Sequence, residues 1–437
     1  MTIAVYFIYN LIFVLDLWDT SLRIYWRMKH LGPGKKVGGK FMAFPTSIPI
    51  ELPFMPDEEK KKRLKPFVIL VSVYNAEGYI REFLDKHRDY LDHMLIVDDH
   101  STDQTYRILE EMGVRYTRNE TNLKKPASIK RALKLLPPNI ETVIVMDPDS
   151  HIMESGYNPR LKDLEEVLSD FQRSGASACA VRINLKEEKG LLSRLQELEY
   201  MICISLGRKS LLDKTVLSGI AIYHRKNLEQ AMEDHLLSVY GEDFMTSLLI
   251  LSNGGRIYYD GRVLVDTEGK PTIKGLISQR IGWDLGYIMV YFYTLARIMR
   301  KKGLTPLLLG DARMFVFYNY LVYLGVFGIL SHPLKLVSIG VLLVSFANLA
   351  VLMMGLPLLT VDTLYSPLWF LSFYISYCIL TGIMIMSAVQ GAKRRRYWTL
   401  MPIYPFYALF LLIIRTIGFT NYISLLAFGK KIYHDHY

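Results

Sequence analysis

Short apolar runs bounded by polar residues recur along the first half of the chain. Residues 67–73 are apolar apart from Ser72, and residues 94–97 and 142–146 have the same character. Continuous runs of this length are typical of strands that are buried on both faces of a sheet. A fourth short strand is expected near 114–117.

Amphipathic stretches lie between these runs. Residues 78–91 and 127–136 have helical periodicity, and Ser101 and Gln104 form a capping-box pattern that opens a third helix, which ends at Gly113. Alternation of strands and helices predicts an α/β domain with a mostly parallel sheet and helices on both faces. Ligands of such sheets bind beyond the carboxyl ends of the strands.

The pattern changes after residue 271. Residues 272–302 combine aromatic and charged side chains at helical spacing, and we interpret them as a helix that lies in a membrane interface. Four apolar segments follow, each near the ~20 residues that a membrane-spanning helix needs. These segments are about 314–331, 334–355, 367–389 and 398–418.

Residues 2–22 are also mostly apolar and lack the features of a cleaved signal peptide, so a membrane anchor is expected. The chain of 437 residues is long enough for several domains. The predicted division is an anchor at 1–24, a basic linker at 25–66, a catalytic α/β domain at 67–271, interface helices at 272–313 and an all-α transmembrane bundle at 314–437.

The formal net charge is +10, and the basic residues cluster beside the apolar segments, as in Lys393–Arg396. This placement favours an anionic membrane surface over nucleic acid as the partner. The basic linker predicts a cytoplasmic catalytic domain, with the plasma membrane as the expected location. Three crossings would then put Lys393–Arg396 outside, against the positive-inside bias, so one of the three is expected to be re-entrant or interfacial.

Pairs of carboxylates follow two of the predicted strands. Asp98 and Asp99 end the second strand, and Asp147 and Asp149 follow the run 142–146. Oxygen ligands at a strand tip suit Mg²⁺ or Mn²⁺ that bridges a carboxylate to substrate phosphates. The plainer alternatives are a solvated loop for Asp147 and Asp149, and a helix cap for Asp98 and Asp99.

Other side chains could complete a site for a nucleotide-sugar. Tyr74 can stack on a base, and Lys125 at a helix N-terminus can meet a diphosphate. Asp243 can deprotonate a sugar hydroxyl as a general base. Lys125 as a solvated residue, Asp243 as a first-turn carboxylate and Trp283 as an interfacial anchor are the alternatives.

Six motifs in chain order resemble the membrane-embedded family 2 glycosyltransferases, which include the cellulose, chitin and hyaluronan synthases and the ceramide glucosyltransferases. The motifs are Tyr74-Asn75, Asp98-Asp99-His100-Ser101-Thr102-Asp103, Asp147-Pro148-Asp149, Ser218-Gly219, Gly241-Glu242-Asp243 and Gln279-Arg280-Ile281-Gly282-Trp283.

The resemblance implies a GT-A (Rossmann-like) fold, a UDP-sugar donor, Mg²⁺ or Mn²⁺, a glycan or glycolipid acceptor, and inversion at the anomeric carbon. It implies Asp243 as the catalytic base and Asp147 and Asp149 as metal ligands. The residues expected to bind the donor are Tyr74, Glu77, Asp98, Asp99, Lys125, Asp147, Gln279, Arg280 and Trp283.

Two positions depart from that family. Gly282 stands where the family has an arginine, and Arg280 faces another side of a helix. Lys124 replaces a usual glycine beside the expected diphosphate. A β-linked polysaccharide synthase is the first expectation, and transfer of one sugar to a lipid acceptor is the alternative that Gly282 leaves open.

Overall fold

A computed structural model describes most of the chain beyond residue 62. The described residues are 63–153, 164–186, 190–206, 215–237, 240–302, 321, 325, 329–361, 365–389 and 393–430. The expected anchor at 1–24, nearly all of the linker at 25–66 and most of the segment 314–331 lie outside them.

The first half of the sheet is parallel, as the apolar runs predict. Four neighbouring strands follow the order β3-β2-β1-β4 and pair in parallel. They are β1 (Phe67–Val73), β2 (Met94–Asp98), β3 (Tyr116–Arg118) and β4 (Thr142–Met146). Every residue of β2 and β4 is buried, which explains the unbroken apolar runs. The carboxyl ends of these strands therefore meet at one edge.

The second half of the sheet is mixed, so the expectation of a mostly parallel sheet is wrong there. β7 pairs antiparallel with both β4 and β6, and β5 pairs antiparallel with β8, while β6 and β8 are parallel. These strands are β5 (Ser150–Ile152), β6 (Ala178–Leu185), β7 (Ala221–His224) and β8 (Ile257–Thr267). The reversal at β7 puts Gly219, two residues before this strand, beside Asp147 at the end of β4.

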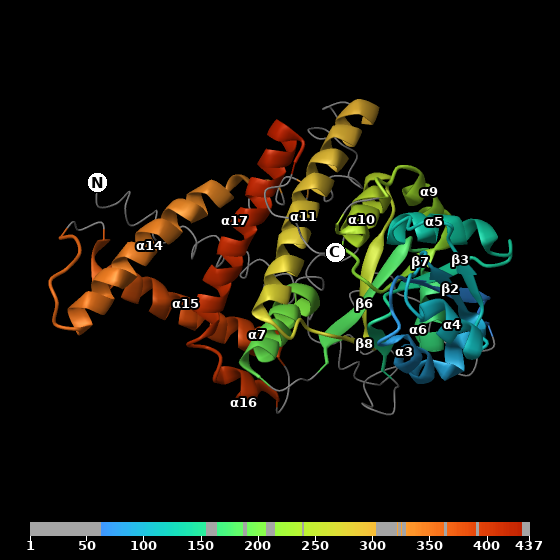
Figure 1. Cartoon of the computed structure of the whole chain (residues 1–437), viewed down its shortest axis with the longest axis horizontal. Helices are drawn as coiled ribbons and strands as arrows, with labels where there is room; N and C mark the ends of the chain where they lie inside the picture. The colour runs from blue at the N-terminus through green and yellow to red at the C-terminus, as the bar shows by residue number, and fades with distance from the viewer. Residues whose placement is uncertain are drawn as a thin grey trace.

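Helices cover both faces of the sheet, as Figure 1 shows, and a hydrophobic core lies on each side. They are α3 (Ile80–Lys86), the 3₁₀ helix Arg88–His93, α4 (Thr105–Glu111), α5 (Lys125–Leu135), α6 (Leu164–Ser174), α7 (Leu191–Tyr200) with the π-helix Met201–Leu206, α9 (Arg225–Glu233) and α10 (Glu242–Ser252).

The capping box expected from Ser101 and Gln104 is wrong. The N-cap of α4 is Gln104, without a side-chain cap. The hydroxyl of Ser101 instead accepts a hydrogen bond from Asn75 N (3.0 Å), and Asp103 Oδ1 accepts from Thr105 N (2.9 Å). Tertiary contact with the loop after β1 therefore replaces the local cap.

Long helices form the C-terminal half. They are α11 (Ile273–Lys302), α14 (His332–Met353), α15 (Pro367–Ala388), the short α16 (Lys393–Trp398) and α17 (Tyr404–Phe428). Among the described residues, three helices, α14, α15 and α17, are long and apolar enough to cross a membrane. The predicted segment 398–418 is displaced relative to α17, which starts six residues later and ends ten residues later. In Figure 1, α11 lies between α10 and α17.

Candidate active site

The ends of β1, β2 and β4 bring the predicted motifs to one edge of the sheet. Val73 is the register partner of Asp98, so Tyr74 and Asp99 leave the two strands side by side. β4 ends at Met146, and Asp147 follows directly. Asp149 is exposed and precedes β5, whose pairing with β8 fixes the chain after it.

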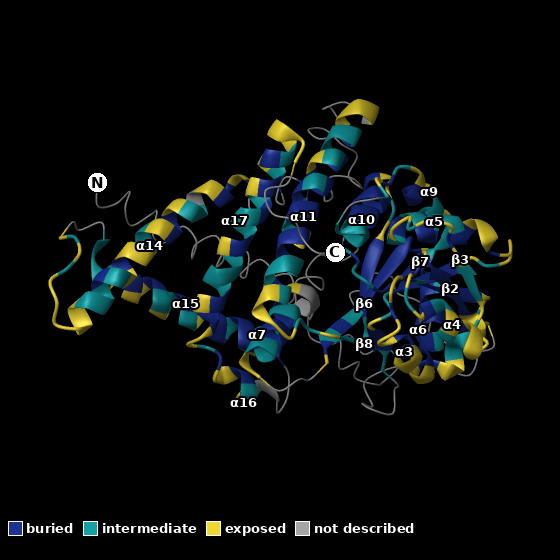
Figure 2. Cartoon of the chain, viewed as in Figure 1, coloured by how far each residue is buried: buried dark blue, intermediate teal, exposed yellow. Residues whose placement is uncertain are grey.

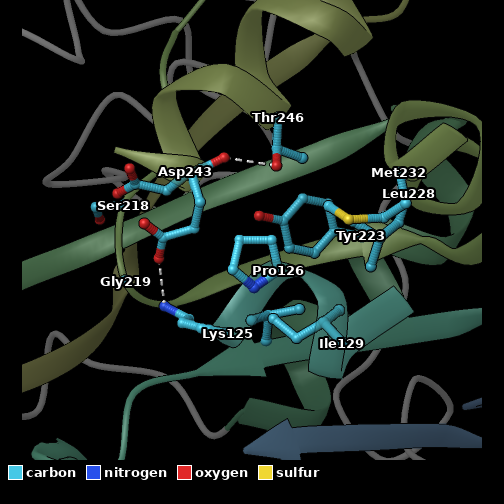
Figure 3. A pocket seen from close by; sticks show the side chains of 12 residues that line it. Lys125, Pro126, Ile129, Ser218, Gly219, Tyr223, Leu228, Met232, Asp243 and Thr246 are labelled. Atoms are coloured by element: carbon cyan, nitrogen blue, oxygen red, sulfur yellow. Dashed lines mark hydrogen bonds and ion pairs between the residues drawn. The ribbon is translucent and has the colours of Figure 1, made fainter. Parts of the chain in front are cut away.

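Lys125 connects two acidic segments of this edge. Its Nζ forms ion pairs with Asp147 Oδ1 and with Glu242 Oε1, the latter at 2.8 Å. Lys125 is the first residue of α5 and Glu242 the first of α10, so two helix N-termini point into the same small pocket. In Figure 3, Lys125 and Asp243 approach this pocket from opposite sides.

Burial and neighbouring charges shift the pKa values of Lys125, Asp147 and Glu242 in opposite directions. Burial raises the pKa of Asp147 to about 6, with Lys125 acting to lower it and Asp149 to raise it. Burial alone would lower the pKa of Lys125, yet Asp147 and Glu242 hold that pKa well above its usual value. The pKa of Glu242 is lowered, since the adjacent Lys125 ammonium outweighs the effect of burial. The site therefore holds more buried carboxylate charge than Lys125 neutralises.

Gly219 is required by the position of Asp147. A Cβ at residue 219 would lie 1.9 Å from Asp147 Oδ2. The Ser218-Gly219 motif therefore has a steric role that its sequence alone does not reveal. It lets the chain before β7 pass against the carboxylate and fixes that side chain between Gly219 and Lys125.

Asp243 lies in the first turn of α10 and lines the same pocket as Lys125 and Tyr223. Its Oδ1 accepts a hydrogen bond from Phe244 N at 2.7 Å. Burial raises the pKa of Tyr223, and Asp243 acts in the same direction, so the phenol stays protonated beside this carboxylate. The structure thus brings Asp243 together with Lys125 and Asp147.

Asp98 and Asp99 are both buried and organise the loops around them. Asp98 Oδ1 accepts from Ser101 N at 3.0 Å, and its Oδ2 lies 3.1 Å from Arg118 Nε. Asp99 accepts from the backbone N–H groups of Leu123 and Lys124, each at 2.8 Å. The loop before α5 is therefore held by Asp99. A role of either residue in binding a nucleotide stays a prediction.

Tyr74 and Glu77 lie on the loop after β1, and both are exposed. Glu77 Oε2 accepts from Gln104 N at 2.9 Å, and Glu77 N donates to Asp103 Oδ2 at 3.1 Å. The loops after β1 and β2 are thus joined, and they leave the ring of Tyr74 at the surface where a base could stack on it.

Gln279, Arg280 and Trp283 lie at the start of α11, in a cluster with α7. Arg280 is buried, and its Nη2 pairs with Glu199 Oε2 at 2.9 Å. Its guanidinium carbon lies 4.1 Å from the ring centre of Trp283, and its Nη1 donates to Gln279 Oε1 at 3.0 Å. Arg280 is therefore already paired inside the protein, whereas Trp283 is exposed.

Tyr200 adds a second aromatic ring to this cluster. Its ring centre lies 6.5 Å from that of Trp283. Burial raises the pKa of Tyr200 to about 12, and Arg280 acts to lower it. Tyr200 and Trp283 thus form an aromatic pair on α7 and α11, next to the buried Arg280.

The residues present fit a divalent cation. Asp147 and Asp149 offer hard oxygen ligands two positions apart, and the excess carboxylate charge at Asp147 favours a second cation. No group of three or more histidine, cysteine, aspartate or glutamate side chains suited to a metal occurs among the described residues. Two carboxylates suit an ion that takes its other ligands from water and substrate phosphates.

Three important residues were not selected from the sequence. The sequence indicates Glu242 only as part of the Asp243 motif, predicts no role for Glu199, and does not reveal the contact of Gly219 with Asp147. The adjacent Glu242-Asp243 pair carried a signal, because acidic residues in a first helical turn point toward the helix N-terminus. Glu199 lies on α7, where nothing local distinguishes it from a solvated glutamate.

Part of the chain matches the model of a known protein family. Residues 68–229 match the family model described as "Glycosyl transferase family 2". The matched residues run from β1 into α9, so this part of the chain is similar to a family 2 glycosyltransferase domain. The match ends before Asp243 and Gln279, so the roles of those two residues are not part of it.

A curated relative is the poly(ribitol-phosphate) beta-N-acetylglucosaminyltransferase TarS of Staphylococcus aureus (strain MW2). It is 26% identical over 205 residues, which are 44% of this chain and 35% of the relative. The chain thus spans about a third of the length of this relative.

Among solved structures, a mannosyltransferase from Pyrobaculum calidifontis in complex with GDP-Man and Mn²⁺ superimposes with a TM-score of 0.55 and 13% identity, covering 97% of this chain and 98% of that one. This likeness confirms the expected GT-A-like fold. Glucosyl-3-phosphoglycerate synthase from Mycobacterium tuberculosis, in complex with Mn²⁺ and UDP, matches over 56% of this chain and 88% of that one at 15% identity and a TM-score of 0.38.

Proposed function

We propose that this protein transfers one sugar from a UDP-sugar to a hydroxyl of a membrane-bound acceptor, with inversion at the anomeric carbon. The observation that carries the proposal is the convergence of Lys125, Asp147, Glu242 and Asp243 on one pocket at the carboxyl edge of the sheet. Such a pocket can hold a diphosphate beside a base, which is what sugar transfer from a nucleotide requires.

The donor is held by the exposed side of this edge. Tyr74 stacks on the base, and Lys125 with the N-terminus of α5 receives the diphosphate. A divalent cation on Asp147 and Asp149, Mn²⁺ or Mg²⁺, would supply Lewis-acid stabilisation of the departing nucleotide. The ammonium of Lys125 pairs with Asp147 and Glu242. When a divalent cation is bound at Asp147, this ammonium can turn toward the phosphates, because the metal then compensates the carboxylate charge.

Asp243 performs the proton transfer. Its carboxylate takes the proton of the acceptor hydroxyl as the oxygen attacks the anomeric carbon. The bond from that carbon to the diphosphate oxygen breaks as the new glycosidic bond forms, and its electron pair leaves with UDP. Attack opposite the leaving group inverts the configuration, and no enzyme-bound sugar intermediate is needed.

The start of α11 favours addition of a single sugar over polymer synthesis. Gly282 supplies no side chain toward the donor, and Arg280 is buried in an ion pair with Glu199. The exposed ring of Trp283, with Tyr200 next to it, offers an aromatic face that suits a sugar or isoprenoid-like acceptor. A lipid-linked acceptor at the cytoplasmic membrane face fits the apolar helices next to this entrance.

The proposal is tested with the purified full chain in liposomes that contain Mn²⁺ and a lipid extract. Release of nucleotide is measured across a panel of UDP-sugars, with GDP-mannose as a second nucleotide arm, and product mass is measured for each active donor. We expect UDP release coupled to a glycolipid one sugar heavier than its acceptor. High-mass polymer formed without added lipid would favour the synthase alternative, and no nucleotide release from any donor would overturn the proposal.

A further inference from the structure

α17 runs parallel to α11 and in contact with it. Gly418 fits against Asp284, where a Cβ would come within 2.8 Å of the Asp284 Cβ. Eight residues further along α11, the ring of Phe292 stacks on Tyr422 with centres 5.7 Å apart. Because residue numbers rise together on both helices, α11 and α17 point in the same direction, as Figure 1 also shows.

Polar contacts strengthen this pair. Arg415 Nε donates to Asp284 Oδ1 at 2.9 Å. The hydroxyl of Tyr407 donates to Glu199 Oε2 at 2.7 Å, the same oxygen that pairs with Arg280. α17 is therefore joined both to α11 and to α7 of the catalytic domain.

The opposite face of α11 is docked on the catalytic domain over the same length. Gly286 lies against Tyr240, where a Cβ would come within 2.1 Å of the carbonyl oxygen, and Tyr287 stacks on Phe244 at 5.5 Å. Near the end of α11, Arg297 pairs with Asp234. From Gly286 to Arg297, the catalytic domain thus lies directly behind α11, on the side opposite to α17.

This arrangement restricts how α17 can be placed relative to a bilayer. If α17 crossed, α11 and the catalytic surface behind it would stand at hydrocarbon depth, where charged and polar groups are costly. Lying along the membrane surface removes that cost. The side of α17 away from α11 carries exposed apolar residues, with Ile413 44% and Ile423 62% accessible.

The hairpin of α14 and α15 begins and ends near the catalytic domain. At its start, His332 stacks on Phe419 of α17 with ring centres 4.2 Å apart. Beyond its end, Arg194 of α7 donates to Arg396 O at 2.8 Å and to Thr399 Oγ1 at 2.6 Å. If α17 lies along the membrane surface, both ends of the segment 332–396 are on the side of the catalytic domain, and this segment must cross an even number of times.

The tip of this hairpin is built for an apolar surrounding. Met353, Leu359 and Val361 are 81%, 66% and 88% exposed, and Figure 2 shows the exposed residues at the far end of α14. Asn348 is fully buried; its amide donates to Thr360 O (3.1 Å) and Tyr365 O (2.8 Å) and accepts from the Leu359 and Thr360 N–H groups (2.9 and 3.3 Å). A loop in lipid needs such internal partners for its backbone.

We infer that the α14–α15 hairpin is the part of residues 332–430 that inserts into the lipid bilayer, and that α17 lies in the membrane surface beside α11. The catalytic domain, the basic segment Lys393–Arg396 and the end of α17 then occupy one face of the membrane. This inference concerns the lipid partner and is independent of the sugar and acceptor proposed above. It also removes the conflict of Lys393–Arg396 with the positive-inside bias.

The depth of α17 is measured with spin labels on the full chain in liposomes. Ile413→Cys, Thr420→Cys and Ala427→Cys lie at seven-residue intervals on its exposed side, in a background where Cys179, Cys203 and Cys378 are replaced by alanine. We expect equal, shallow depths for these three and a deeper label at Val361→Cys. A crossing helix would change depth by about 10 Å between successive labels, and this result would overturn the inference.

A second measurement does not depend on the cysteine-free background. A peptide tag after residue 437 of the otherwise native chain is compared with a tag in the exposed loop at Asn139, by protease digestion of sealed vesicles of known orientation. We expect both tags to be digested in the same vesicles and protected in the opposite ones. Protection of one tag while the other is digested would contradict the shared face.

Discussion

Lys125 Nζ and Glu242 Oε1 lie 2.8 Å apart and join the N-termini of α5 and α10 across the pocket. The same ammonium pairs with Asp147. This shared positive charge balances the carboxylates of the pocket before a donor binds, and it remains available to bind the phosphates of the donor.

Replacing Lys125 by methionine should lower kcat/KM for the donor by about 10²–10³-fold, the usual cost of removing one group that stabilises developing charge. Lys125→Arg should retain part of the activity. Lys65→Met is the matched control, because Lys65 forms an exposed ion pair with Glu141 and such pairs contribute little. Equal kinetics of Lys125→Met and the wild type would contradict the role of this residue.

Gly219→Ala should displace Asp147 and weaken Mn²⁺ binding. The new Cβ would stand 1.9 Å from Asp147 Oδ2, so the carboxylate must turn away. We expect about a 10–100-fold loss of Mn²⁺ affinity, as when the support of a metal ligand is removed, measured by electron paramagnetic resonance. Gly78→Ala is the control, since no atom lies within 4 Å of its Cβ position. Unchanged affinity in Gly219→Ala would show that Asp147 does not hold the ion.

Lys124 combines a charge with a strained backbone. Its φ of +70° is in the region that favours glycine, and a non-glycine residue there costs about 1–3 kcal/mol. Lys124→Gly should therefore raise the melting temperature while it raises the donor KM through loss of the ammonium. Lys124→Ala should raise the donor KM to the same extent as Lys124→Gly but should not raise the melting temperature. A donor KM that stays at the wild-type value in both variants would mean that the charge does not serve the diphosphate.

His87 predicts an acid-sensitive stability. Its Nδ1 lies 2.7 Å from Phe83 O and its Nε2 accepts from Ile152 N at 3.1 Å, so the ring is neutral in the fold. Burial lowers the pKa of His87, with the Phe83 carbonyl acting in the other direction. A depressed histidine pKa means that the unfolded chain binds the proton more tightly. Stability is then complete above the ordinary histidine pKa of about 6.5 and decreases as pH falls below it.

The measurement is the melting temperature of the wild type and of His87→Gln between pH 7.5 and pH 5. The glutamine variant should be less stable at pH 7.5 and should lose less on acidification. Other carboxylates also respond to acid, so the difference between the two profiles is the readout. Parallel profiles would exclude His87 as the titrating group.

The parallel strands and their chemistry were accessible from the sequence because burial on both faces leaves unbroken apolar runs. β4 was predicted at 142–146, where the structure has it, and the acidic residues at its end followed from its direction. The antiparallel insertion of β7 could not be predicted from the sequence, since it depends on which strand edge remains open after the first four strands have paired.

Two misjudged features have a common physical reason. The predicted segment 398–418 ends ten residues before α17 does; in the structure, Arg415 inside the segment pairs with Asp284 of α11, and Asn421 beyond the segment is buried, so the helix continues past both. Glu242 was overlooked for its neighbour Asp243, although it is Glu242 that pairs with Lys125. In each case, a partner distant in the chain determines the role of the residue.

The most direct test of the proposed chemistry is Mn²⁺-dependent UDP release by purified full-length Asp243→Asn, compared with the wild type at equal Mn²⁺ occupancy. The account predicts normal Mn²⁺ binding, because Asp147 and Asp149 are intact, and a loss of release by about 10²–10⁴-fold, the contribution of a general base. Release at the wild-type rate with a sugar still transferred to the acceptor would contradict it.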